Sequence, residues 1–157
     1  MRRAAVLLSA ALALSAGASA VDAHNLRAVR SVESSINSMR AQHGCGPLRL
    51  HLGLSRSAGR QARLLLADGE LDHDAGSPMP QRLHRAAPSA SLLGEDLAWG
   101  TGSAARPKSI VRAWMHSPMH RQIMLDCRFS QLGVGIAAGR FGQRGTRATV
   151  YAADFAA

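Results

Sequence analysis

The side chains best suited to chemistry in this 157-residue sequence are two cysteines and seven histidines. Cys45 and Cys127 could form a disulfide, hold a metal as a thiolate pair, or supply a nucleophile. Two lone cysteines so far apart make a poor zinc signature. An even number of cysteines in an exported protein favours a disulfide, and a bridge closing so long a loop would stabilise the fold by about 4–5 kcal/mol. We therefore predict a Cys45–Cys127 disulfide.

Two histidines stand at a spacing that could matter for catalysis. His116 and His120 are four residues apart, which places two side chains on one face of an unbroken helix. Pro118 lies between them and interrupts such a helix, so we expect His116 at the surface, outside any shared site. The sequence also contains no Gly-x-Ser-x-Gly nucleophile elbow and no His-Glu-x-x-His helix. It therefore carries no recognised nucleophile or metalloprotease motif.

The N-terminus has the three parts of a secretory signal peptide. Two arginines follow the first methionine, an apolar run covers residues 4–17, and Ala18-Ser19-Ala20 is a small-residue cleavage site. A membrane span needs about 20 apolar residues, and this run is shorter. We expect a signal peptide over residues 1–20, with cleavage after Ala23 as a second option. Residues 21–157 then form one secreted or periplasmic domain without a transmembrane segment, and the alternative is an uncleaved N-terminal helix.

The chain is basic, and its charge bears on the kind of partner it has. Removing Arg2 and Arg3 with the signal peptide leaves 17 basic and 10 acidic residues, a net charge of +7. An anionic partner is one explanation, but the arginines are spread evenly along the chain and Lys108 is the only lysine. Aromatic residues make up only 4% of the sequence, and none alternate with the charges as a nucleic-acid strip requires. Nucleic acid is therefore not the expected partner.

The hydrophobic pattern places helices first and strands last. Apolar residues recur at helical spacing in the first half, whereas the last segments alternate as strands do. We predict helices over residues 26–43, 54–68 and 107–115, helical turns around 81–85 and 120–125, strands over 132–138 and 148–155, and an irregular connection over 69–91. This order lacks the alternation of a doubly wound fold and predicts an α+β fold.

Several short stretches resemble the bacterial branch of the CAP superfamily, the cysteine-rich secretory, antigen and pathogenesis-related group. Each stretch alone is a weak match, but their order and spacing cover nearly the whole predicted mature chain. They are Ile36–Arg40 with Gly44 and Pro47-Leu48, His73 in its polar loop, Gly94–Ala98, the run from Val111 through Trp114–Arg121 to Gly135, and, more weakly, Tyr151–Phe155. The resemblance implies a three-layer α-β-α sandwich around a central antiparallel sheet.

The resemblance also implies a cleft that holds two histidines and two acidic residues. Three of these carry over by motif, namely His73, Glu95 and His120. The fourth is a glutamate in eukaryotic members, and Ser117 stands at that position here. Asp96 replaces the usual Asn after Glu95. The absence of the glutamate at position 117 weakens any mechanism that needs both acids, whereas Asp96 changes the wall of the cleft.

The chemistry open to His73, His120 and Glu95 depends on whether they bind a metal. Imidazoles commonly bind Zn²⁺ or another divalent cation, and two of them with one carboxylate would leave coordination positions open. Glu95 could be the third ligand, a partner that orients a histidine, or a general base and so the candidate catalytic residue. Alternatively, the three groups form a hydrogen-bonded network that only holds the loops in place.

Three functions remain open on these grounds, the third of which is a purely structural protein of the envelope. The first is a secreted binding or interaction module of the cell envelope or extracellular space, whose ligand is a lipid, an envelope polymer or a protein surface. The second is a metal-dependent hydrolase, a peptidase or a nuclease, that uses the same cleft. The missing fourth acid and the lack of a recognised nucleophile favour the binding module, which we expect to be a monomer.

Overall fold

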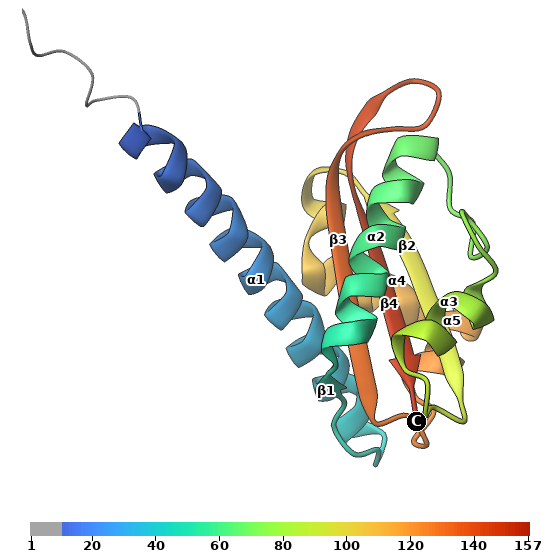
Figure 1. Ribbon diagram of the computed structural model, residues 1–157. Helices are drawn as coiled ribbons and strands as arrows, with labels where there is room; N and C mark the ends of the chain where they lie inside the picture. Colours follow the sequence, from blue (N-terminus) through green and yellow to red (C-terminus); the bar gives the residue numbers. More distant parts are fainter. Residues whose placement is uncertain (1–10) are drawn as a thin grey trace, which may run out of the picture.

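The computed structural model describes residues 11–157, and Figure 1 shows how its elements are arranged. The charged start of the predicted signal peptide lies outside the described residues. The predicted cleavage site falls within the first helix, α1 (Ala11–Gln42), whose N-terminal half projects away from the other elements (Figure 1). Among residues 11–157, no helix is long and apolar enough to span a membrane.

The remaining elements follow the predicted order, with helices before the last two strands. They are β1 (Arg49–Leu50), α2 (Leu52–Asp68), α3 (Met79–Ala86), β2 (Leu93–Gly100), the 3₁₀ turn η1 (Gly102–Ala105), α4 (Pro107–His116), α5 (Pro118–Met124), β3 (Gln131–Phe141) and β4 (Thr146–Ala156). The break between α4 and α5 falls at Ser117-Pro118, because proline begins a helix well but cannot continue one.

The strands form one four-stranded sheet in the order β1-β3-β4-β2. β4 pairs antiparallel with both of its neighbours, β2 and β3, whereas β1 pairs with β3 in parallel through two residues. The sheet is therefore mixed, and the expected antiparallel sheet holds for its three long strands. The sequence gives no strand signal for β1, because two residues are too few to show an alternating pattern.

Helices cover both faces of the sheet, which confirms the three-layer α-β-α arrangement. α2 and α3 pack on one face, and α1, α4 and α5 pack on the other (Figure 1). Successive side chains of β4 point to opposite faces of the sheet and so join different cores. Tyr151 and Phe155 join the core under α1, α4 and α5, while Val150 and Ala152 join the core under α2.

Two glycines let α2 lie unusually close to the sheet. A Cβ added at Gly133 would stand 2.2 Å from the backbone of Leu54, and one at Gly135 would stand 2.1 Å from the backbone of Ala58. Neither α2 nor the strand could accommodate such a contact without moving. The two glycines of β3 therefore serve to pack α2 against the sheet. They do not form a phosphate loop, which would need a helix directly after the strand.

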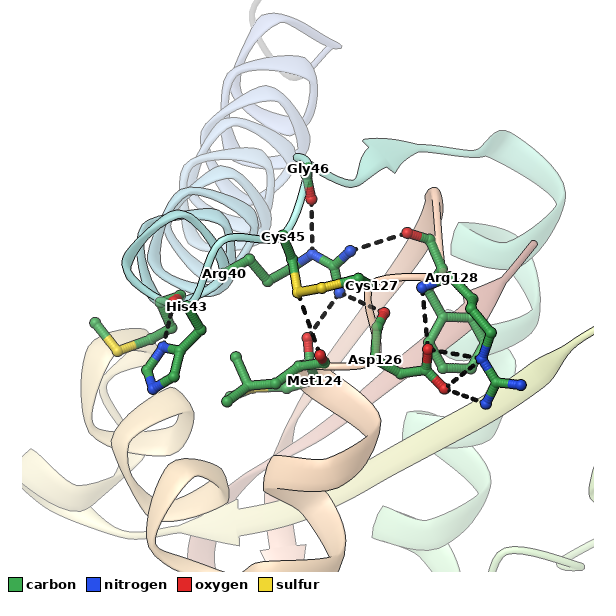
Figure 2. The surroundings of a disulfide bond; sticks show 11 residues. Arg40, His43, Cys45, Gly46, Met124, Asp126, Cys127 and Arg128 are labelled. Carbon is green, nitrogen blue, oxygen red and sulfur yellow. Dashed lines mark hydrogen bonds and ion pairs between the residues drawn. A yellow bond between two sulfur atoms is a disulfide. The ribbon is translucent and has the colours of Figure 1, made fainter.

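A covalent bond joins the end of α1 to the end of α5. Cys45 and Cys127 form the predicted disulfide, which excludes the thiolate-metal and nucleophile alternatives for this pair (Figure 2). Beside it, the fully buried guanidinium of Arg40 donates only to backbone carbonyls, those of Gly46 (2.9 Å), Met124 (2.8 Å), Asp126 (3.0 Å) and Phe129 (2.9 Å) (Figure 2). Arg40 therefore satisfies carbonyls of several loop segments that have no strand or helix partner.

Leu26 is the first residue of the predicted helix over residues 26–43, but 59% of its surface is exposed, because the core under α1 begins at Val29. The cap of α2 is His51, whose ring nitrogen accepts from the backbone N–H of Leu54 at 3.3 Å.

Candidate functional site

The site begins with two acidic side chains on adjacent strands. Glu95 of β2 and Asp154 of β4 are register partners, so both carboxyl groups point to the same face of the sheet, beneath α2 and α3. Both side chains are completely buried. Two carboxylates this close repel each other, so the pair requires a cation or a proton.

Arg82 of α3 supplies the cation. Its Nη2 donates to Glu95 Oε2 at 2.5 Å, and its Nη1 lies 3.3 Å from Asp154 Oδ2. The same Nη1 donates to the hydroxyl of Ser57 on α2 at 3.0 Å. A single buried guanidinium therefore links α3 to two strands and to α2, in a geometry that a lysine could not reproduce.

The network is not completely satisfied. Arg82 Nε and Asp154 Oδ1 are buried without a hydrogen-bond partner among the described residues. Burial, together with the neighbouring Glu95 carboxylate, raises the pKa of Asp154 well above its usual value, and Arg82 opposes that shift only in part. This shift favours the neutral form of Asp154, in which the repulsion between two charged carboxylates is absent.

His73 completes the network at the protein surface. It follows α2 in a turn built by its acidic neighbours, since Asp72 accepts from the backbone of Asp74 at 2.9 Å and Asp74 accepts from the backbone of Met79 at 2.8 Å. The two aspartates therefore form the turn that carries His73. His73 Nδ1 lies 2.8 Å from Glu95 Oε1, and this bond is the main cause that raises the pKa of His73.

The bond between His73 and Glu95 has two chemical consequences. A carboxylate only accepts hydrogen bonds, so Nδ1 of His73 carries the proton and Nε2 is the nitrogen left to meet a ligand. The imidazole of His73 is half exposed, whereas the side chain of Glu95 is completely buried behind its hydrogen-bond partners. Both oxygens of Glu95 are occupied, one by His73 and the other by Arg82.

His120 approaches from the other layer. It lies on α5, which packs against the edge strand β2, and its Nδ1 is 2.7 Å from the hydroxyl of Ser117. Burial, followed by the charge of His73, lowers the pKa of His120. Ser117, which stands where eukaryotic members have a glutamate, therefore orients this histidine.

The structure brings the expected residues together only in part. His73 and Glu95 are bonded, while the hydrogen bond found for the His120 side chain runs to Ser117. Within residues 11–157, no three His, Cys, Asp or Glu side chains are grouped so that they could hold a metal ion. Glu95 therefore positions the ring of His73, and the cation site expected from the sequence stays a prediction. His116 points elsewhere, as expected, since its Nδ1 contacts the carbonyl of Arg112 at 2.7 Å.

Asp96 lies on the opposite face of β2 from Glu95 and outside this network. It is fully buried, and neither carboxyl oxygen has a partner in the described part of the chain. Burial is the main cause that raises the pKa of Asp96 to about 8. At neutral pH the side chain is therefore mostly a neutral acid, a form that resembles the asparagine found at this position in related proteins.

Arg82, Asp154 and Ser57 were missed by the sequence analysis. Arg82 lies in a predicted helical turn and Asp154 in the weakest of the matched motifs, so neither carried a signal of its own. The pairing could have been found only from the register of β2 against β4, which the sequence does not reveal.

Comparisons with known proteins agree with this fold. The model of the cysteine-rich secretory protein family, CAP, matches residues 34–155. The Bacillus subtilis protein YkwD is 31% identical over 102 residues, which cover 63% of this chain but only 38% of YkwD. The chain thus spans less than half the length of this curated relative.

Solved structures with low sequence identity share the fold. An outer surface protein of Borrelia burgdorferi matches with a TM-score of 0.67 at 21% identity, covering 83% of this chain and 92% of that one. An extracellular protein of Bacillus anthracis that contains an SCP domain matches with a TM-score of 0.65 at 20% identity, covering 82% of this chain and 39% of that one. These two relatives are described as outer-surface and extracellular proteins.

Proposed function

Since the chain belongs to the CAP family of cysteine-rich secretory proteins, we propose that it is an exported binding module of the cell envelope or extracellular space, with a divalent-cation site at His73 and His120. The disulfide supports export, because such bonds persist in oxidising compartments. The descriptions of the structural relatives as extracellular and outer-surface proteins point the same way.

The observation that carries this proposal is the occupation of both Glu95 oxygens. A general base needs a free oxygen within reach of the proton that it removes. Glu95 is buried and already accepts from His73 and Arg82, so breaking either bond would leave a charged group without its partner. The arrangement therefore supports a positioning role for Glu95 and favours binding over hydrolysis.

A cation such as Zn²⁺ would be held by the Nε2 atoms of His73 and His120, with solvent or a ligand completing its coordination. When bound, it would polarise a carbonyl or phosphoryl oxygen of that ligand. His73 must lose its extra proton first, and its raised pKa makes cation binding weaker at acidic pH.

Calorimetric titration of the oxidised protein with Zn²⁺ tests the site. We expect about one ion per chain, lost in both His73→Ala and His120→Ala. His116→Ala is the matched control, because His116 is an exposed histidine on the neighbouring helix whose ring contacts only a backbone carbonyl. No Zn²⁺ binding, or equal losses in the control, would rule out the cation site.

The hydrolase alternative has its own readout. It requires metal-stimulated cleavage of a peptide or nucleic-acid substrate that Glu95→Gln abolishes while Zn²⁺ binding persists. We expect no such turnover, because Glu95 is tied to Arg82 and His73.

A further inference from the structure

The opposite face of the sheet carries a second, elongated surface that is basic. There the ends of β3 and β4 extend beyond α4 as a hairpin, flanked by the segment around η1 (Figure 1). A cavity of about 540 Å³ has Ile136, Ala138 and Thr149 on its floor, with Arg27 of α1 and Arg106 in its walls. A second cavity of about 280 Å³ shares Ala138 and continues to Arg140 and Arg147.

The charges along this surface all have the same sign. Arg27, Arg106, Arg140 and Arg147 are exposed, and no acidic residue lines either cavity within the described part of the chain. The N-terminal end of α4 lies in the same wall, and the helix dipole adds partial positive charge there. The surface therefore attracts anions along its length.

One pair of arginines needs an outside partner more than the others. Arg140 and Arg147 are directly opposite each other on β3 and β4, and like charges in that position destabilise a sheet. Arg140 makes one long hydrogen bond to the carbonyl of Gly145 at 3.4 Å, and neither arginine has an ion-pair partner among the described side chains. An anion bridging the two guanidinium groups would turn this repulsion into attraction.

The dimensions of the surface favour a chain-like ligand. Ile136 and Arg140 are four residues apart on one strand, a distance of about 13 Å at ~3.3 Å per residue. The two adjoining cavities together are therefore longer than one phosphate group. A bilayer is a poor fit because the site is concave. Nucleic-acid bases find no ring to stack on, because Tyr151, the one aromatic residue that lines the cavity, is buried and donates its hydroxyl to the carbonyl of Ala105.

We propose that this groove, defined by Arg27, Arg106, Arg140 and Arg147, binds a flexible linear polymer that carries phosphate groups. Phosphate oxygens accept from the planar guanidinium fork at several angles, so successive phosphates can bind the arginines in turn. The groove lies on the other face of the sheet from Glu95 and requires neither His73 nor a cation. It adds a second binding surface to the proposed module.

The test uses inorganic polyphosphate as the probe, with binding to the oxidised protein measured over a range of salt concentrations. We expect R140Q/R147Q to weaken binding at least tenfold and to reduce the steepness of the salt dependence by about 1–2 in the log–log slope. The matched control is R56Q/R60Q, which removes the same charge from two exposed arginines of α2 on the other side of the molecule. We expect this control and His73→Ala to bind nearly as the wild type does.

Three outcomes would overturn the proposal. Equal weakening in R56Q/R60Q would show a general effect of net charge. Tighter binding of oligodeoxythymidylate than of polyphosphate would assign the groove to nucleic acid. Binding to anionic phospholipid vesicles without binding to polyphosphate would assign it to a membrane surface. If the protein binds polyphosphate but not Zn²⁺, the proposed His73–His120 site is contradicted and the proposed groove is not.

Discussion

Among residues 11–157, two arginine side chains are buried, and their surroundings differ in kind. Arg40 lies beside the disulfide and donates to four backbone carbonyls, whereas Arg82 donates to Glu95, Asp154 and Ser57. Carbonyls keep their charge distribution at every pH, but carboxyl groups gain and lose protons. The cluster around Arg40 is therefore fixed in charge, and the network around Arg82 changes its charge with protonation.

The two regions also differ in how completely their polar atoms are paired. Every guanidinium nitrogen of Arg40 has a hydrogen-bond partner, whereas Arg82 Nε and Asp154 Oδ1 have none among the described residues. Unpaired buried atoms in a native protein frequently mark a functional site. The comparison teaches that the same residue type serves the fold in one place and a candidate site in the other.

The largest expected effect is that of Arg40→Met. The substitution removes the donors of four carbonyls at once, so we expect the free energy of unfolding to fall by about 3–5 kcal/mol. Urea denaturation followed by tryptophan fluorescence measures this loss, which should be the same at pH 5 and pH 8. Arg30→Met, at an exposed ion pair with Glu33, is the control and should change stability by no more than about 0.5 kcal/mol. A loss below about 1 kcal/mol for Arg40→Met would contradict the structural role.

A smaller, pH-dependent effect is expected for Asp154→Asn. Because its folded-state pKa is raised, Asp154 stabilises the wild type fully below the ordinary aspartate value, and this contribution is lost as the pH rises through the folded-state pKa. Each unit of pKa elevation corresponds to about 1.4 kcal/mol at high pH. We therefore expect near-equal stability at about pH 3, below the ordinary aspartate pKa, and a more stable variant at pH 9.

Urea denaturation of both proteins across this pH range checks the sign of the Asp154→Asn effect. Asp96, with a pKa raised to about 8, makes the free energy of unfolding fall with rising pH in both proteins. The difference between the two free energies therefore isolates the contribution of Asp154. Parallel curves for wild type and variant would show that Asp154 is charged in the fold and would remove the contrast between the two arginines.

The smallest effect is expected at the surface of the Arg40 region. Hydrogen bonds from Arg128 lower the pKa of Asp126 to about 2, so the stability that this pair contributes is present above pH 4 and is lost as the pH falls through 2 (Figure 2). Arg128→Gln should raise the pKa of Asp126 toward its ordinary value, as an NMR titration of the carboxyl carbon would show. An unchanged pKa would mean that the exposed pair does not form in solution.

The sequence was sufficient to predict some parts of the fold and the site but not others. The disulfide followed from the cysteine count, and the family resemblance implied His73 and Glu95 as residues of one cleft but did not predict the hydrogen bond between them. The Arg82–Asp154 contact was not predictable, because it joins residues 72 positions apart through a strand register and a helix placement. β1 was missed because it is too short to show a pattern, and the positions of Gly133 and Gly135 became meaningful only once α2 lay against them.

The disulfide has a consequence for how the chain responds to proteolysis. Cys45 and Cys127 are 82 residues apart, and the exposed connection that carries His73 lies between them. A protease that cuts once in this connection produces two fragments that remain covalently joined at the corner beside Arg40. Because the fragments cannot diffuse apart, the strands and helices on either side of the cut can reassemble at an effective concentration far above that of free fragments.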